Sequence, residues 1–438
     1  MRIAIATFGC KANQYDSEII RENFEENNFD LVPFSEPADI YVINTCTVTG
    51  KTDFQARQLI RKTYRVNPQA KIVVTGCYAQ AAPEELKKIP GVSVVIGNPD
   101  KWEIVNIIKE EEKNPSSGIR VTPVEKEIIF PEKKIKRFSA KTRFFLKIQD
   151  GCNAQCAYCI IPRVRGSSRS LAPKTVLELL GSIGSSGYKE TVLTGIHLGS
   201  YGLDLSPQTS LLNLLHKIEK QMPVSRIRLS SIEPNEVTRK MVDLLAASMI
   251  VCPHLHLPLQ SGDNTILRKM NRPYSAENFQ SLVGTLTNSI KNLAIGADVI
   301  VGFPGEGEEE FNRTLRLLEE LPITYLHVFP FSPRKGTRAF SLPNKVNGNA
   351  VKNRGEILRR LSKQKRESFY RSYLNKELAV LIEARRHRTT GLLKGLSRNY
   401  IPVLIDGGNE LMNTEIPVRI VSVEGEEVKG KIAQQVHG

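Results

Sequence analysis

Three cysteines, Cys152, Cys156 and Cys159, stand on one short stretch of the chain with the spacing C-x3-C-x2-C. Three thiolates on one loop can hold three irons of a [4Fe–4S] cluster and leave the fourth iron without a protein ligand. An open iron can bind a substrate or a cofactor, so this spacing indicates chemistry rather than a purely structural metal. The alternative is a zinc loop, but structural zinc sites use four ligands, commonly paired as C-x2-C motifs. The sequence contains no second close pair of cysteines.

Three further cysteines, Cys10, Cys46 and Cys77, each follow an apolar run that is typical of a β-strand. The runs are residues 3–7, 39–44 and 71–75. The carboxyl ends of parallel strands meet at one edge of a sheet, where ligands bind. We therefore expect the three thiols to converge, and we favour a second three-cysteine cluster. The alternative is that each cysteine is a small buried hydrophobic residue, which we also expect of Cys252.

The elements that must position Cys10, Cys46 and Cys77 alternate between strands and helices. A fourth strand is expected at residues 92–96, and helices at residues 16–27, 52–66 and 100–111. Alternating strands and helices predict a doubly wound parallel α/β domain. We place this domain at residues 1–113 and a linker at residues 114–141. The basic run at residues 133–137 in the linker is either a solvated face or a phosphate contact.

A second series of strands and helices follows and carries the cysteine loop. Strands are expected at residues 144–148, 190–193, 226–229, 254–257, 295–301 and 323–328. Helices are expected at residues 174–186, 211–220, 236–247, 276–288 and 308–321. Six such units predict a partial (β/α)6 barrel, and active sites of such barrels lie at the carboxyl ends of the strands. The loop of Cys152 follows the first strand and is therefore expected on that face.

Other residues at these strand ends are candidates for cofactor binding: Gly195, Glu233 and Gly302. Glycine lets a backbone approach a ligand closely, although glycine and proline also simply end strands. Three histidines stand near strand ends as well, namely His197, His254 and His256. For these, polar barrel residues bonded to the backbone are at least as good an interpretation as catalysis.

The last part of the chain has a different pattern, a long basic helix followed by short β-runs. Residues 350–373 form a long helical pattern rich in Lys and Arg, which is either a solvated helix or a surface that tracks an RNA backbone. Short β-runs follow at residues 378–383, 400–405 and 416–423. They predict a small antiparallel β-barrel of the OB-like kind, a common nucleic-acid-binding shape. We place the partial barrel at residues 142–373 and the small barrel at residues 374–438.

The composition narrows the class of protein. The chain has 438 residues, of which 40% are hydrophobic and 24% charged, with a formal net charge of +15. So much positive charge indicates a polyanionic partner, nucleic acid first and an anionic membrane surface second. No apolar run approaches the roughly 20 residues of a membrane-spanning helix. We interpret the apolar N-terminus as a buried strand rather than a signal peptide. Seven scattered cysteines argue against disulfides, and we expect a cytoplasmic protein.

With both cysteine sets in view, the sequence resembles the radical S-adenosylmethionine (SAM) methylthiotransferases over essentially its whole length. The resemblance implies an N-terminal methylthiotransferase domain, a radical SAM partial barrel and a C-terminal TRAM domain. It implies that Cys152, Cys156 and Cys159 hold the SAM-binding [4Fe–4S] cluster and that Tyr158 lies beside the SAM adenine. It likewise implies that an auxiliary [4Fe–4S] cluster is held by the other set, Cys10, Cys46 and Cys77.

This family has three bacterial branches. The sequence is most similar to the branch that modifies N6-threonylcarbamoyladenosine in tRNA. The segments that carry this similarity are residues 8–18, 41–49, 74–80 and 147–152. The branch that acts on isopentenyladenosine typically has Gln-Met after the first cysteine, and the branch that acts on a ribosomal-protein aspartate has Pro. Here Lys11 and Ala12 stand at those positions.

The resemblance implies a reaction and its partners. An aromatic C–H is too weakly acidic for a side-chain base, and acid–base catalysis supplies only about 10²–10⁴-fold, so the cofactors must supply one-electron chemistry. The implied partners are the tRNA anticodon arm and a low-potential electron donor such as a flavodoxin or ferredoxin, with no membrane. The alternatives are the same chemistry on isopentenyladenosine or on a ribosomal-protein aspartate, and a non-catalytic protein that binds zinc and RNA.

Overall fold

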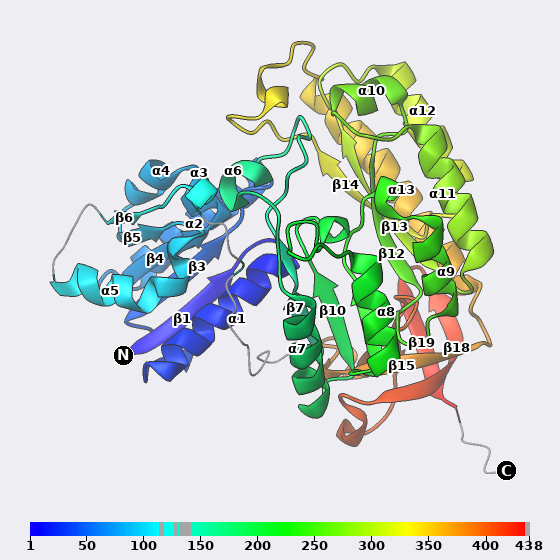
Figure 1. The fold of residues 1–438 in the computed structure, drawn as a ribbon, viewed down its shortest axis with the longest axis horizontal. Helices are drawn as coiled ribbons and strands as arrows, with labels where there is room; N and C mark the ends of the chain where they lie inside the picture. The colour runs from blue at the N-terminus through cyan, green and yellow to red at the C-terminus, as the bar shows by residue number, and fades with distance from the viewer. Residues whose placement is uncertain (114–117, 127–129, 131–141, 434–438) are drawn as a thin grey trace.

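The structure is a computed structural model that describes residues 1–113, 118–126, 130 and 142–433. The basic run predicted at residues 133–137 lies outside the described residues. An N-terminal sheet, a central set of strands and helices, and a C-terminal barrel follow one another along the chain (Figure 1). Within the described part of the chain, no helix is both long and apolar enough to cross a membrane.

The N-terminal part is a six-stranded parallel sheet in the order β2-β1-β3-β4-β5-β6. Its strands are β1 (Arg2–Thr7), β2 (Asp30–Val32), β3 (Ile40–Thr45), β4 (Lys71–Gly76), β5 (Val92–Ile96) and β6 (Ile119–Arg120). Its helices are α1 (Lys11–Glu26), α2 (Gly50–Val66), α3 (Cys77–Ala81), α4 (Pro83–Lys87), η1 (Asp100–Glu103) and α5 (Ile104–Lys113). Neighbouring strand residues such as Val42 and Ile43 enter different core clusters, because successive side chains point to opposite faces. Both faces are therefore covered, as the sequence predicted.

The central part has the six predicted strands, arranged as two three-stranded parallel sheets, β11-β10-β7 and β12-β13-β14. The strands are β7 (Arg143–Lys147), β10 (Glu190–Thr194), β11 (Arg226–Leu229), β12 (His254–Gln260), β13 (Ala294–Val301) and β14 (Tyr325–Pro330). An isolated parallel β-bridge links Ile227 of β11 to Val251, which lies just before β12. The two sheets share one large core with the surrounding helices, which confirms the partial barrel.

The helices around these strands are α6 (Ile161–Arg165), α7 (Pro173–Ser185), α8 (Leu211–Gln221), α9 (Arg239–Ala247), α10 (Asn264–Lys269), α11 (Ala276–Ser289) and α12 (Glu308–Glu320). The remaining short elements are η2 (Val124–Lys126), β8 (Gln149–Asp150), β9 (Arg169–Ser170), η3 (Leu198–Ser200), η4 (Pro234–Glu236), η5 (Arg338–Ser341) and η6 (Asn409–Leu411).

The C-terminal part begins with the long helix α13 (Gly348–Arg371) and ends in a closed barrel with its own core. The barrel strands are β15 (Glu377–Arg386), β16 (Leu393–Ser397), β17 (Pro402–Ile405), β18 (Glu415–Glu424) and β19 (Glu427–Ile432). Their pairing is antiparallel except between β17 and β19, which run parallel. The sequence pattern missed β16 and β19, because each has a glycine in mid-strand. A Cβ on Gly395 would lie 2.4 Å from Val380, so the tight barrel excludes a side chain there.

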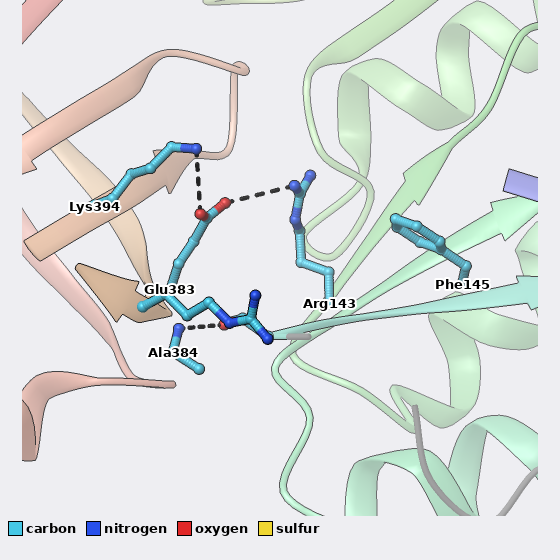
Figure 2. A pocket seen from close by; sticks show the side chains of 7 residues that line it. Arg143, Phe145, Glu383, Ala384 and Lys394 are labelled. Atoms are coloured by element: carbon cyan, nitrogen blue, oxygen red, sulfur yellow. Dashed lines mark hydrogen bonds and ion pairs between the residues drawn. The ribbon is translucent and has the colours of Figure 1, made fainter. Parts of the chain in front are cut away.

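The C-terminal barrel covers the amino-terminal ends of the central strands. Arg226 and Arg228 pair with the buried Glu190, and their outer nitrogens donate to main-chain carbonyls of β16 and the residue that follows it. Figure 2 shows a second contact, around a cavity of about 330 Å³, where Glu383 lies between Arg143 and Lys394. These contacts leave the carboxyl ends of the strands for the candidate site.

Candidate active site

The thiols of Cys10, Cys46 and Cys77 lie at the carboxyl ends of β1, β3 and β4, which are adjacent in the sheet. Cys10 precedes α1, Cys46 follows β3 directly, and Cys77 begins α3. A Cβ on the residue before Cys10, Gly9, would lie only 2.7 Å from the Sγ atom of Cys46. Burial, together with the nearby thiols of Cys77 and Cys10, raises the pKa of Cys46 to about 12. The fold thus brings together the three cysteines, as expected from the strand ends.

A glycine with positive φ stands immediately before three of the candidate cysteines. Gly9, Gly76 and Gly151 have φ angles of +94°, +93° and +72° and precede Cys10, Cys77 and Cys152. A side chain is strained in this region of φ. The Gly-Cys dipeptide is therefore a local sequence signal for the turn that positions each of these three thiols.

The loop of Cys152, Cys156 and Cys159 follows β7 and the short strand β8. The Ala154 N–H donates to the Sγ atom of Cys152 at 3.3 Å. The main chain of Ala157 is fixed on both sides, by Met270 O at 2.9 Å and by the Ala339 N–H at 2.7 Å. This loop is held by packing between distant segments of the barrel rather than by regular secondary structure.

Charged side chains surround the loop, and one of them, Arg272, was not predicted from the sequence. The Arg272 guanidinium donates to Cys156 Sγ at 3.0 Å and to the Tyr158 hydroxyl at 3.4 Å, and it pairs with Glu233. On the other side, His197 Nδ1 lies 3.4 Å from Cys152 Sγ. No local pattern distinguishes Arg272, because it lies far along the chain from the cysteines.

The cavity beside the loop has a volume of about 270 Å³. Its walls include Cys156, His197, Glu233, Glu236 and Arg272. His197 Nε2 lies 2.7 Å from Glu236 Oε1, so this histidine is held by a side chain rather than by backbone. Desolvation, partly offset by Arg272, raises the pKa of Glu233. The cavity therefore offers both a cation and a carboxylate next to a candidate metal ligand.

The other predicted cofactor residues, Gly195 and Gly302, have protein atoms as their nearest neighbours. A Cβ on Gly195 would lie 2.9 Å from the side chain of Gln149, and one on Gly302, where φ is +78°, would lie 2.3 Å from Val351. The Tyr158 ring packs against the apolar cluster that contains Ala157. The roles of these residues in cofactor binding stay predictions.

The spacing of the thiols bears on which metal group they fit. A tetrahedral zinc ion with Zn–S bonds of 2.3 Å would hold its sulfurs about 3.8 Å apart. In the described part of the chain, neither cysteine set is among the groups whose ligand atoms all lie within 4.8 Å of one another. In each set at least one pair of sulfurs is therefore more than 4.8 Å apart, which fits a cluster that offers a separate iron to each thiolate. The donor sets therefore fit iron–sulfur clusters better than zinc.

A buried charge network lies beside the thiols. Asp16 of α1 lies 2.6 Å from Lys101, 2.5 Å from Lys147 and 3.0 Å from Arg165, and Asp150 pairs with the last two cations as well. Burial would raise the pKa of Asp16, but the three cations outweigh it and hold this pKa well below its usual range. Three cations face two carboxylates, so the network carries excess positive charge.

This excess charge lies next to the N-terminal thiols. Burial alone would lower the pKa of Arg165, but Asp150 and the thiols of Cys77 and Cys10 lie close enough to raise it well above its usual value. Positive charge favours the thiolate form. The network therefore suits an anionic thiolate-bound cluster at Cys10, Cys46 and Cys77, and it also joins the N-terminal sheet to the barrel.

Direct contacts connect the two cysteine sets. Cys77 packs with Ile160 and Val164, which follow the last cysteine of the barrel loop. The side-chain amide of Asn98 donates to the main-chain carbonyl of Val164 at 2.6 Å and lies 3.8 Å from Cys77 Sγ. The N-terminal sheet and the barrel therefore present their two sets to the same region of the molecule.

A second contact fixes the N-terminal sheet beside Cys46. Arg334, which follows β14, lies 2.6 Å from Asp53 and donates to the main-chain carbonyl of Thr47 at 3.1 Å. Thr47 is the residue directly after Cys46. The loop after the last barrel strand thus holds the turn that carries this thiol.

Comparisons with known proteins agree with this architecture. Residues 2–97 match the model of the uncharacterized protein family UPF0004, and residues 146–318 match the radical SAM superfamily. The chain is 39% identical over 424 residues to the threonylcarbamoyladenosine tRNA methylthiotransferase MtaB of Bacillus subtilis, covering 96% of this chain and 93% of that protein. The chain belongs to the radical SAM methylthiotransferase family. This confirms the resemblance noted in the sequence, and the protein is a radical SAM methylthiotransferase.

Further members of the family show similar coverage. The MtaB protein of Aquifex aeolicus is 38% identical, with 94% of this chain and 98% of that protein covered. The tRNA-2-methylthio-N(6)-dimethylallyladenosine synthase of Pelotomaculum thermopropionicum is 31% identical, with 99% and 98% covered. Among solved structures, the radical SAM methyltransferase TsrM of Kitasatospora setae, which holds cobalamin and a [4Fe–4S] cluster, has a TM-score of 0.58 at 14% identity, covering 77% of each chain. That likeness bears on the fold alone.

Proposed function

We propose that this enzyme converts N6-threonylcarbamoyladenosine at position 37 of tRNA to its 2-methylthio derivative. The observation that carries this proposal is identity over nearly the whole chain to methylthiotransferases named for threonylcarbamoyladenosine, at 39% and 38%, against 31% for a relative named for dimethylallyladenosine. The residues after the first cysteine, Lys11 and Ala12, favour the same choice.

Each cysteine set has its own role in the proposal. Cys152, Cys156 and Cys159 hold the SAM-binding [4Fe–4S] cluster, and the other set, Cys10, Cys46 and Cys77, holds the auxiliary cluster. When bound, the clusters and SAM supply the one-electron chemistry and the methylthio group that no side chain can provide.

Side chains around the barrel loop orient the cofactor. Arg272 and Glu233 line the cavity of about 270 Å³ beside Cys156. A guanidinium and a carboxylate are complementary to the carboxylate and ammonium groups of an amino acid, and charge-assisted hydrogen bonds of this kind fix orientation. We assign the methionine end of SAM to this cavity. A low-potential protein such as a flavodoxin or ferredoxin is the proposed electron donor.

The positive charge of the chain supports RNA as the macromolecular partner. The exposed face of α13 carries Lys352, Arg359, Arg360 and Lys363. Phosphate contacts by such side chains supply sequence-independent affinity that falls with salt. In the proposal, this face and the C-terminal barrel bind the anticodon arm. In the proposal the enzyme acts in the cytoplasm, where tRNA is modified.

The experiment is complementation followed by mass spectrometry of tRNA nucleosides. The gene is expressed in Bacillus subtilis that lacks its own MtaB, with an empty vector as control. The proposal predicts that 2-methylthio-N6-threonylcarbamoyladenosine returns while other methylthio-nucleosides stay constant. Failure of this nucleoside to return, together with a rise in the isopentenyladenosine product or a methylthio-aspartate in a ribosomal protein, would assign the enzyme to another branch.

A further inference from the structure

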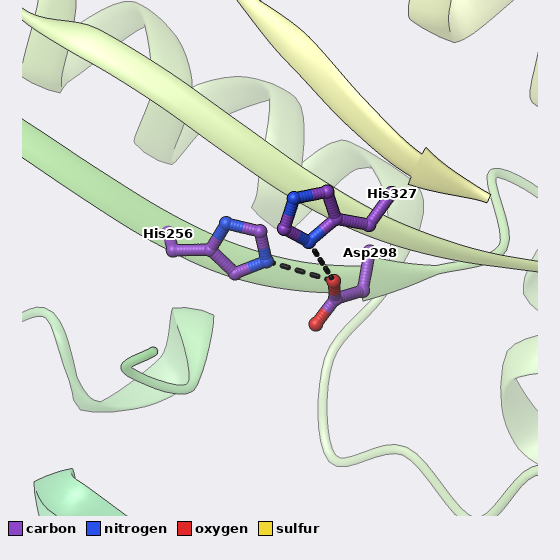
Figure 3. Close-up of side chains that lie close together, drawn as sticks. All are labelled: His256, Asp298 and His327. Atoms are coloured by element: carbon purple, nitrogen blue, oxygen red, sulfur yellow. Dashed lines mark hydrogen bonds and ion pairs between the residues drawn. The ribbon is translucent and has the colours of Figure 1, made fainter. Parts of the chain in front are cut away.

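A group of metal-ligating side chains that contains no cysteine lies on three neighbouring strands. His256 is on β12, Asp298 on β13 and His327 on β14, and Asp298 is directly opposite His327 in the parallel register. Figure 3 shows the three side chains together on one face of the sheet. Leu255 and Ala297, their neighbours along the strands, enter the core on the opposite face. The group therefore points to the inner face of the partial barrel.

The ligand atoms of the three side chains lie close to one another. His256 Nε2 lies 2.8 Å from Asp298 Oδ1, and His327 Nδ1 lies 3.3 Å from the same oxygen. The three ligand atoms all lie within 4.8 Å of one another. Two ring nitrogens thus converge on one carboxylate oxygen, where one bound cation could replace the hydrogen bond from His256 and the ion pair with His327.

We propose that His256, Asp298 and His327 form a binding site for one divalent first-row transition-metal ion of the zinc type. Two imidazoles and a carboxylate are a donor set that suits such ions, and three protein ligands leave a position open for water or a substrate oxygen. The site shares no ligand with either cysteine set and uses nitrogen and oxygen rather than sulfur.

A second residue fixes the orientation of His256. The Tyr325 hydroxyl lies 3.2 Å from His256 Nδ1 and 2.8 Å from His254 Nε2. If His256 Nε2 binds a metal, its proton resides on Nδ1 and donates to the Tyr325 oxygen. Metal-bound histidines characteristically bond their second nitrogen in this way, which fixes the tautomer and the ring.

The backbone beneath the site leaves room for this arrangement. A Cβ on Gly296 would lie 2.5 Å from the Tyr325 hydroxyl and 2.6 Å from His256 Nδ1, so a larger residue would push this pair apart. The site is also accessible, because the side chain of His327 is 52% exposed and that of Asp298 is 21% exposed. An ion can therefore reach the ligands without unfolding of the barrel.

The test measures metal binding to enzyme whose two iron–sulfur clusters have been reconstituted, so that the cysteines do not compete. Zinc is added, equilibrium dialysis gives the free concentration, and elemental analysis gives zinc bound per chain. Cobalt is then bound in place of zinc, and its electron paramagnetic resonance signal reports the nitrogen and oxygen ligands. Neither readout depends on methylthiotransferase activity.

Three variants decide the outcome. His327→Asn alters an exposed side chain, and Asp298→Asn keeps the size and a hydrogen-bond acceptor while removing the charge. The matched control is His216→Asn, an exposed histidine on α8. We expect one saturable zinc site in the wild type and in His216→Asn. The zinc affinity of the other two variants should be at least about 100-fold weaker. Loss of a residue that only orients a metal ligand typically costs about 10–100-fold. Absence of a saturable site, or equal affinity in all variants, would overturn the proposal.

Discussion

The two cysteine sets reach the same region of the molecule in different ways. Cys152, Cys156 and Cys159 belong to a single loop, so their spacing can be read directly from the sequence. The other three cysteines lie at the ends of three adjacent strands and meet only when the sheet forms. A site built on one loop is specified locally, whereas a site built across a sheet depends on strand order and on how two domains dock.

The two sets also differ in the charged side chains that surround them. Arg272, from a distant loop of the barrel, contacts the barrel set directly through Cys156. The N-terminal set has the buried network of Asp16 and Arg165 beside it, and this network also joins two domains. Disturbing the network should therefore affect the N-terminal set more than the barrel set.

Removal of each set should separate two reactions, and this is the largest expected effect. Replacing Cys152, Cys156 and Cys159 by Ala should abolish both SAM cleavage and methylthiolation, because the SAM-binding cluster is lost. Replacing the N-terminal set should abolish methylthiolation but keep SAM cleavage. Chromatography of 5′-deoxyadenosine and mass spectrometry of tRNA nucleosides measure the two products. Cys252→Ala, a lone buried cysteine, is the control and should keep both.

Equal loss of SAM cleavage in the two triple variants would contradict the assignment of separate roles.

The buried network should contribute strongly to stability. Asp16→Asn leaves Lys101, Lys147 and Arg165 facing a single carboxylate, and breaking a buried pair costs about 3–5 kcal/mol. Denaturant unfolding measures the free energy of unfolding. Asp243→Asn is the matched control, because its pair with Arg239 is exposed and such pairs contribute about 0–1 kcal/mol. A loss in Asp16→Asn no larger than in the control would show that the network does not hold the domains together.

The glycines before the cysteines allow a direct comparison of the two sites. Gly151→Ala would place a Cβ 1.9 Å from the main-chain oxygen of Ser167, whereas Gly9→Ala would meet the side chain of Cys46 at 2.5 Å. Forcing an unsuitable residue into such a conformation costs about 1–3 kcal/mol, and we expect the larger loss at Gly151. On α7, Gly181→Ala meets nothing within 4 Å and should stabilise the helix by about 0.5–1 kcal/mol. Thermal unfolding ranks the three, and a neutral Gly151→Ala would contradict the strain argument.

The smallest expected effect is a pH dependence of stability that arises at Glu190, where the C-terminal barrel covers the amino-terminal ends of the central strands. Burial opposes ionisation of Glu190, but Arg228 and Arg226 outweigh it and lower its pKa from 4.5 to about 2. A lowered pKa means that stabilisation is present above about pH 4.5 and is lost as the pH falls toward 2. The difference in unfolding free energy between wild type and Glu190→Gln should shrink by about 1 kcal/mol between about pH 6 and about pH 4. A constant difference would contradict the pairing.

Sequence patterns predicted the parts of the structure that depend on neighbouring residues. The strands that lead to Cys10, Cys46 and Cys77 and the loop of Cys152 were read from local apolar runs and spacing. Their convergence followed from the rule that parallel strands share an edge. The short strands β2 and β6 and the glycine-containing strands β16 and β19 lacked such a pattern and were missed.

Side chains that meet only in the folded chain could not be predicted. Arg272 reaches Cys156 across more than one hundred residues of sequence, a separation of 116 positions. His256 was recognised as a strand residue near a possible site, but nothing local connects it with Asp298 or His327. Its partners are side chains of two other strands, and not the backbone groups that were considered for it.

The central claim is that the chain carries two separate iron–sulfur sites, and an iron count tests it most directly. After anaerobic reconstitution, wild-type enzyme should contain about eight irons and eight acid-labile sulfides per chain, four for each [4Fe–4S] cluster. Alanine at Cys10, Cys46 and Cys77 should leave about four, and so should alanine at Cys152, Cys156 and Cys159. An unchanged iron content in either triple variant, or a loss of all iron in both, would contradict the account.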